Sequence, residues 1–159
     1  MKAGLEPMVR DAPPPSAVMR VVNPLMRIVL RTPMARLIRP LAVLTFEGHR
    51  TARRRQIVVG WHLLDGSSIV VTPATWLVNF AEARVATVWW RGQASSWVGT
   101  LEADPDSVAA ALDQLLRSGT SDRALALRVP PGHAITSADV VETRRAIIRF
   151  RIDSGVAAY

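Results

Sequence analysis

Five basic side chains stand close together in one short segment of the chain, between positions 49 and 55. They are His49, Arg50, Arg53, Arg54 and Arg55. The forked guanidinium group of arginine binds phosphate and carboxylate oxygens in pairs, so such a cluster suits a polyanion. The formal net charge of +7 also favours anionic partners. The segment therefore predicts an anion-binding site.

Other kinds of catalytic site lack their usual residues. The chain has no cysteine, which excludes disulfides, zinc–thiolate sites and thiol nucleophiles. Its three histidines are scattered, so we expect no metal site built by the protein. It contains no Gly-x-Ser-x-Gly elbow and no glycine-rich phosphate loop of the GxxxxGK[ST] or GxGxxG type. If the protein is an enzyme, a bound cofactor should carry the reaction.

The apolar segments on either side of the basic cluster predict strands. Residues 41–47 are expected to form a strand that ends at the basic loop, and residues 56–64 form the strand after it. Asp65 and Gly66 then provide a tight turn into a third strand at 67–73, so the last two strands should form a hairpin. The basic loop would thus lie at one end of a sheet.

The rest of the chain predicts one more hairpin, several helices and a final strand. The hairpin covers residues 84–103, and one or two helical turns precede it. Helices are expected after Asp104 and after Thr136, each of which can cap a helix N-terminus. In the final strand, 146–153, the apolar residues at 148, 150 and 152 would face one way and charged residues the other. About six strands with helices at both ends indicate an α+β domain around a small antiparallel barrel.

The N-terminal part divides in two. Residues 1–15 are polar and proline-rich and are expected to form a flexible arm, whereas residues 16–159 form a single domain. Within 16–39 we expect amphipathic helices with arginines on one face, which either pack on the domain or make peripheral contact with an anionic membrane. Since no apolar run approaches the length of a membrane span, we expect a cytoplasmic protein with possible attachment to a membrane surface.

Several short motifs occur in an order that resembles one protein family. The chain contains first NPLMRIVLRTPMARLIRPLAVLTFEGHRTARRRQIVVGW, then DGSSIVVTPATWLVNFAEARVATVWWRG, and later RALALRV and AIIRFRID. Over residues 23–153 it is similar to the deazaflavin-dependent nitroreductase family, whose members are split β-barrel flavin and deazaflavin reductases common in actinobacteria. The resemblance implies an α+β fold built on a small antiparallel split β-barrel of the FMN-binding type, with N-terminal and inserted helices.

The resemblance also implies a function. Such a protein is an oxidoreductase that uses reduced deazaflavin coenzyme F-420 to transfer a hydride to a small acceptor such as a quinone, a nitro compound or an enone. The alternatives to coenzyme F-420 are FMN or the absence of any redox cofactor. A proton donor would assist the transfer, and His62 is a candidate on the predicted second strand. The protein would act as a monomer or a homodimer.

Specific positions of the chain match the family's cofactor site. They are Gly48, His49, Arg50, Thr51, Arg53, Arg55, Trp76 and Asn79. By the resemblance, the basic loop binds the phosphate and acidic tail of the coenzyme, while Trp76 walls its ring system and the Asn79 amide bonds the edge of the ring. Three positions depart from the family pattern: His49 replaces an arginine, Ala52 replaces a glycine, and Val58 replaces a proline often found in the following strand. We expect Ala52 to cost the loop its freedom to adopt a positive φ.

Two other classes of function are compatible with the residues. The first is a non-catalytic split-barrel protein that binds a flavin, a tetrapyrrole or an apolar ligand. The second is a nucleic-acid-binding protein that uses the basic loop and stacks bases on its tryptophans. The second is disfavoured, because Trp89, Trp90 and Trp97 fall on predicted barrel strands away from the basic loop.

Overall fold

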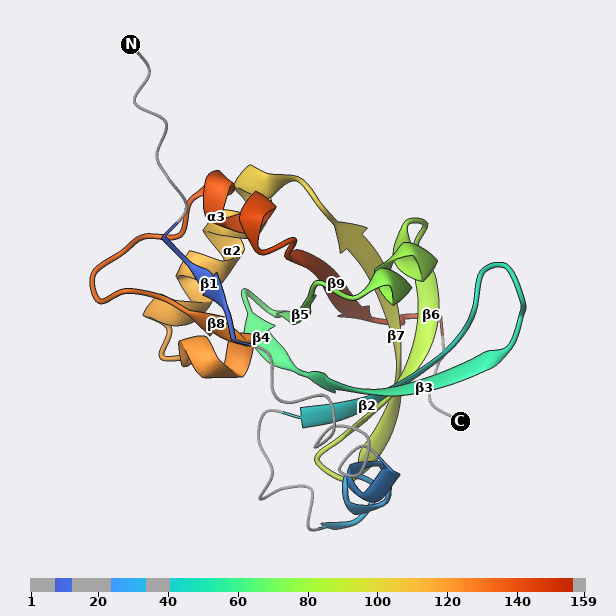
Figure 1. Ribbon diagram of the computed structural model, residues 1–159. Helices are drawn as coiled ribbons and strands as arrows, with labels where there is room; N and C mark the ends of the chain where they lie inside the picture. The colour runs from blue at the N-terminus through green and yellow to red at the C-terminus, as the bar shows by residue number, and fades with distance from the viewer. Residues whose placement is uncertain (1–7, 13–23, 34–40, 156–159) are drawn as a thin grey trace.

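The main feature of the fold is a curled antiparallel sheet. The computed structural model describes residues 8–12, 24–33 and 41–155. Seven strands form the sheet in the order β3-β2-β6-β7-β9-β5-β4, and it curls into a half-barrel (Figure 1). The strands are β2 (Leu41–Glu47), β3 (Arg54–Gly60), β4 (His62–Leu64), β5 (Ser67–Thr72), β6 (Arg84–Trp90), β7 (Gln93–Glu102) and β9 (Ala146–Ile152). The predicted α+β class and antiparallel sheet are therefore confirmed, with one strand more than expected.

Short helices and a two-stranded ribbon complete the described part of the chain. Residues 24–29 are helical. The remaining elements are η2 (Thr75–Phe80), α2 (Pro105–Arg117), η3 (Asp122–Leu125), α3 (Ser137–Glu142) and the ribbon of β1 (Arg10–Asp11) with β8 (Leu127–Arg128). The carboxylate of Asp104 accepts the N–H of Ser107 at 2.9 Å and caps α2, and Thr136 caps α3, as the sequence predicts.

The predicted strand 56–64 is broken into two strands that belong to opposite edges of the sheet. Residues Arg54 to Gly60 pair with β2, whereas His62 to Leu64 pair with β5. The predicted hairpin is therefore wrong for β3 and correct only for β4 and β5. The chain bends at Trp61, whose buried indole packs against Trp97 and Phe150 inside the curl.

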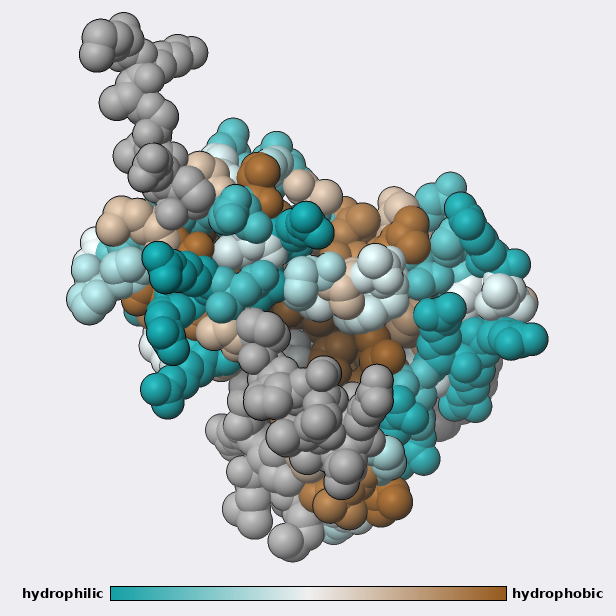
Figure 2. Space-filling view, viewed as in Figure 1, coloured by the Kyte–Doolittle hydropathy of each residue, from teal (hydrophilic) through white to brown (hydrophobic). Residues whose placement is uncertain are grey.

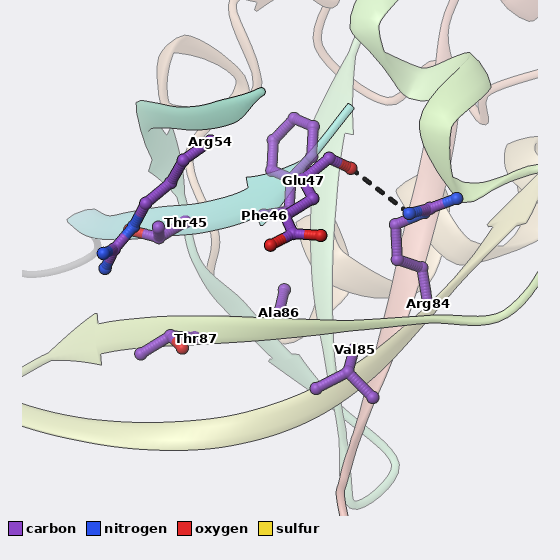
Figure 3. Close-up of a pocket in the computed structure, with 8 residues that line it drawn as sticks. All are labelled: Thr45, Phe46, Glu47, Arg54, Arg84, Val85, Ala86 and Thr87. Carbon is purple, nitrogen blue, oxygen red and sulfur yellow. Dashed lines mark hydrogen bonds between the residues drawn. The ribbon is translucent and has the colours of Figure 1, made fainter. Parts of the chain in front are cut away.

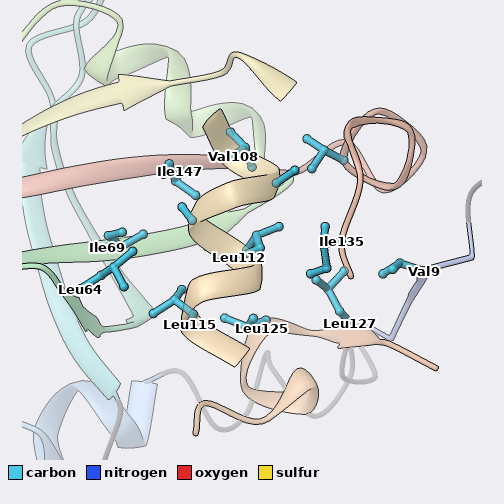
Figure 4. Close-up of a cluster of buried hydrophobic side chains, with 13 residues drawn as sticks. Val9, Leu64, Ile69, Val108, Leu112, Leu115, Leu125, Leu127, Ile135 and Ile147 are labelled. Atoms are coloured by element: carbon cyan, nitrogen blue, oxygen red, sulfur yellow. The ribbon is translucent and has the colours of Figure 1, made fainter. Parts of the chain in front are cut away.

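Two large apolar cores lie on the two faces of the sheet. One fills the inside of the curl, and the other lies between the sheet and α2 (Figure 4). The final strand contributes to both, because Ile148 belongs to the first core and Ile147 to the second. This corrects the predicted half-buried pattern: α2 covers the face that carries Ile147 and Arg149, whereas Ile152 is 68% exposed. Arg149 pairs with Glu102 on that face at 2.6 Å.

A buried carboxylate fixes the first described segment, although residues 1–15 are predicted to be a flexible arm. Asp139 is 1% exposed and lies at the start of α3. Burial raises the pKa of Asp139, but its hydrogen bonds lower the pKa more, so that it lies well below the usual value. The donors are the backbone N–H groups of Met8, Val9 and Thr136, the hydroxyl of Thr136 and Nε2 of His133.

Only residues 24–33 of the predicted amphipathic segment 16–39 lie within the described residues. Leu30 is buried against Val43 on the outer face of the sheet, while Leu25 and Ile28 are exposed. No helix in the described ranges is long and apolar enough to cross a membrane.

Candidate functional site

The basic loop between β2 and β3 forms a pocket with η2. The pocket has a volume of about 290 Å³. Its lining includes every predicted cofactor-site residue except Arg53, and adds Thr75 and Val78 from η2. The lining residues are Gly48, His49, Arg50, Thr51, Arg55, Thr75, Trp76, Val78 and Asn79. Segments 30 residues apart in the sequence thus meet at one place.

Backbone hydrogen bonds close the loop on itself. The N–H of Gly48 donates to the carbonyl of Arg53 at 2.9 Å, and the N–H of Ala52 donates to the carbonyl of Gly48 at 3.0 Å. A Cβ at position 48 would lie 3.1 Å from Oγ1 of Thr51, which explains a glycine there. Ala52 has a φ of 49°, so the expectation that alanine prevents a positive φ is wrong. The hydrogen bonds of the loop hold Ala52 in this left-handed conformation despite its cost.

The Asn79 amide ties the loop to η2. Its Oδ1 accepts the backbone N–H of His49 at 2.9 Å and lies 3.0 Å from Nδ1 of the same histidine. Its Nδ2 donates to the carbonyl of Trp76 at 2.7 Å. Asn79 is buried, and these bonds engage both ends of its amide. Asn79 is therefore a positioning residue of the loop, and its role as a ligand-binding amide, which the resemblance implies, stays a prediction.

Arg84 makes a second connection between the same two elements. Its Nε donates to the backbone carbonyl of Asn79 at 2.8 Å. Its Nη1 donates to the backbone carbonyl of Glu47 at 3.3 Å, as Figure 3 shows. Glu47 directly precedes the loop, so this guanidinium holds both walls of the pocket together. Sequence reasoning missed Arg84, since an arginine at the start of a valine-rich strand carries no signal of this contact.

Trp76 is half-buried and forms an aromatic wall of the pocket. Its ring centroid lies 5.9 Å from that of Phe46 and 6.1 Å from that of Phe80, which belongs to the core inside the curl. Aromatic pairs at these separations stabilise one another. Trp76 therefore packs against the core inside the curl and also lines the pocket.

The arginines of the loop carry positive charge that the rest of the described chain does not neutralise. Arg50, Arg53 and Arg55 are exposed, and none forms an ion pair with a described residue. Hydrophilic residues cover the surface where the β2–β3 loop projects (Figure 2). The backbone N–H groups of Arg50 and Thr51 also lack an acceptor among the described residues. The pocket thus offers several donors to an anion.

A larger pocket of about 470 Å³ is lined by residues of β2, β3 and β6 (Figure 3). Arg54 lines this pocket, whereas the next residue of β3, Arg55, lines the smaller one. The two arginines are separated because consecutive residues of a strand face opposite ways. The lining of the larger pocket is Thr45, Phe46, Glu47, Arg54, Arg84, Val85, Ala86 and Thr87. We favour the smaller pocket as the anion site, because it has two arginines and a histidine without a carboxylate.

His62 does not lie in the candidate site. It is buried at the start of β4, beyond the end of β3 that lies away from the loop, and does not line the pocket. Burial lowers its pKa, so the imidazole is neutral at physiological pH. The sequence-based suggestion of His62 as a proton donor in this pocket therefore finds no support in the geometry.

Comparison with known proteins does not identify a family for this chain. A scan against protein-family models gives no match, and a search of curated proteins finds no significantly similar sequence. The resemblance to deazaflavin-dependent nitroreductases therefore stays a prediction, which has to be judged on the site itself.

Proposed function

We propose that the protein is a split-barrel reductase that binds the deazaflavin coenzyme F-420 and reduces a small acceptor such as a quinone, a nitro compound or an enone. The observation that carries the proposal is the pocket formed by the β2–β3 loop and η2. A match based on short motifs predicted eight positions, and all but Arg53 line this one pocket. This agreement supports a common binding site for them.

The chemistry of the pocket fits the anionic part of this coenzyme. A phosphodiester and several carboxylates need multiple donors, and Arg50, Arg55 and the loop N–H groups supply them. The volume of about 290 Å³ is at the lower end of the range for ligand pockets. We therefore expect the pocket to hold one end of the coenzyme, with Trp76 alongside the start of its ring system.

The residues of the chain have separate roles in this proposal. Reduced coenzyme F-420 supplies the hydride when it is bound. Arg50 and Arg55 bind its negative charges through forked donors. Asn79 and Arg84 keep the loop at a fixed distance from η2, and this fixed arrangement orients the bound ligand. Trp76 excludes water from one side.

Fluorescence titration with oxidised coenzyme F-420 tests the proposal. We expect Arg50→Ala and Arg55→Ala each to weaken binding by about tenfold or more, because each removes a charge-assisted hydrogen bond. Arg151→Ala is the matched control, since Arg151 is an exposed arginine of β9 that does not line the pocket. No binding at about 50 μM coenzyme, or equal losses in all three variants, would overturn the proposal.

Turnover separates the reductase from a protein that only binds the coenzyme. Reduced coenzyme F-420 with a menadione-like quinone should be oxidised faster in the presence of the wild type than with Arg50→Ala. Binding without turnover of quinone, nitro and enone acceptors would instead favour the non-catalytic split-barrel binding protein.

A further inference from the structure

The hydrogen bonds of Asn79 determine which nitrogen of His49 can exchange a proton. Asn79 Nδ2 donates to a backbone carbonyl, and Asn79 Oδ1 accepts a backbone N–H, so the orientation of the amide is fixed. Since this oxygen can only accept, His49 Nδ1 at 3.0 Å must carry a hydrogen. Nε2 is therefore the nitrogen that gains or loses a proton.

The free nitrogen belongs to a side chain that lines the anion pocket. His49 is exposed and lies in the pocket with Arg50 and Arg55. In the neutral ring, Nε2 presents a lone pair, which repels an anionic oxygen. In the protonated ring it presents a charged donor, which attracts one. The two protonation states thus have opposite effects on an anion at this place.

The charges around His49 are mostly positive. Residues Thr75–Phe80 of η2 include no acidic or basic side chain. The charged side chains of the loop and of the elements next to it are Arg50, Arg53, Arg54, Arg55, Arg84, Glu47 and Glu82. A protonated His49 therefore stands among mostly positive side chains, and a bound anion would supply the negative charge that stabilises it.

We propose that an anion binds in this pocket together with a proton on Nε2 of His49, so that His49 makes the affinity for anions increase as the pH falls. The inference rests on the anion-binding part of the proposed function and not on hydride transfer. By linkage, an anion that prefers the protonated ring must cause uptake of a proton when it binds.

Sulfate is a suitable probe because its charge does not change across the relevant pH range. Titrations at constant ionic strength, followed by the backbone amide signals of residues 48–52, would be done at about pH 5.5 and about pH 8, which bracket the usual titration of histidine. We expect sulfate to bind the wild type about tenfold more weakly at the higher pH. Calorimetry in two buffers of different ionisation enthalpy should show proton uptake at intermediate pH.

Two variants provide the controls. His49→Arg keeps a permanent positive charge at this position, so its sulfate affinity should be the same at both pH values. Arg50→Ala should bind more weakly at both pH values and keep the pH dependence. Equal sulfate affinity of the wild type at both pH values, or the same pH dependence in His49→Arg, would overturn the inference and leave the proposed function standing. If neither sulfate nor coenzyme F-420 binds at either pH, both fail.

Discussion

Replacing Asn79 with alanine removes three side-chain hydrogen bonds, two of which join η2 to His49 of the basic loop, while the third lies within η2. Each contributes about 1 kcal/mol net, so the upper limit is about 3 kcal/mol. The pocket admits water to part of this network, and we therefore expect the free energy of unfolding to fall by about 2 kcal/mol. For a domain of this size the melting temperature should then fall by about 6 °C.

Urea unfolding followed by tryptophan fluorescence measures this loss, because Trp76 lies in the affected element. Val78→Ala is the matched control, since Val78 belongs to η2 but is 51% exposed. Asn79→Ala should also weaken sulfate and coenzyme binding, because the loop is no longer held against η2. A loss of stability below about 0.5 kcal/mol, which is typical of surface substitutions, would refute the argument that Asn79 positions the loop.

Substitutions at three further positions test other parts of the structure. The pKa of Asp139 lies below its usual value of about 3.9. The ionised carboxylate therefore stabilises the folded protein above about pH 4, and this contribution is lost as the pH falls. Asp139→Asn should destabilise by about 3 kcal/mol at pH 7, and urea unfolding at several pH values should show the difference shrink below about pH 4. Ala52→Gly should stabilise the folded protein by about 0.5 kcal/mol and Ala52→Val should destabilise it, because only glycine tolerates the positive φ without strain. Melting temperatures of the two variants that move in the same direction would contradict this. Gly99→Ala places a Cβ 2.6 Å from Phe150 and 2.8 Å from Phe80 and should cost about 2 kcal/mol in urea unfolding, whereas an unchanged midpoint would show that both rings can move.

The sequence predicted those parts of the fold that depend on neighbouring residues. The apolar run of β2, the turn before β5 and the caps of α2 and α3 are all signals within a few residues, and each is confirmed. The break at Trp61 could not be predicted, because it arises where the two edges of the sheet meet. The burial of Ile147 likewise depends on α2, which packs on that face from elsewhere in the chain.

The candidate site shows the same division. The basic residues of the loop predicted an anion-binding site, and the resemblance added Trp76 and Asn79 to it. The role of Asn79 nevertheless required its distance to His49, which is 30 positions away in the sequence. Among the described residues, Arg84 donates hydrogen bonds to backbone carbonyls, and sequence patterns do not encode such contacts. His62 does not line this pocket, and the sequence could not show this, because a histidine on a strand is equally compatible with a buried position.

The position of β9 has a consequence for how the protein is made. This strand lies between β7 and β5 and is the only described link between the part of the sheet that contains β2, β3 and β6 and the part that contains β4. Its partners lie far back in the chain, and such non-local pairing slows folding. On the ribosome, residues 41–102 would emerge with their two sheet segments unjoined and apolar surface exposed. The nascent chain therefore depends on its last strand, and we expect termination before residue 146 to yield aggregation-prone material rather than a smaller stable domain.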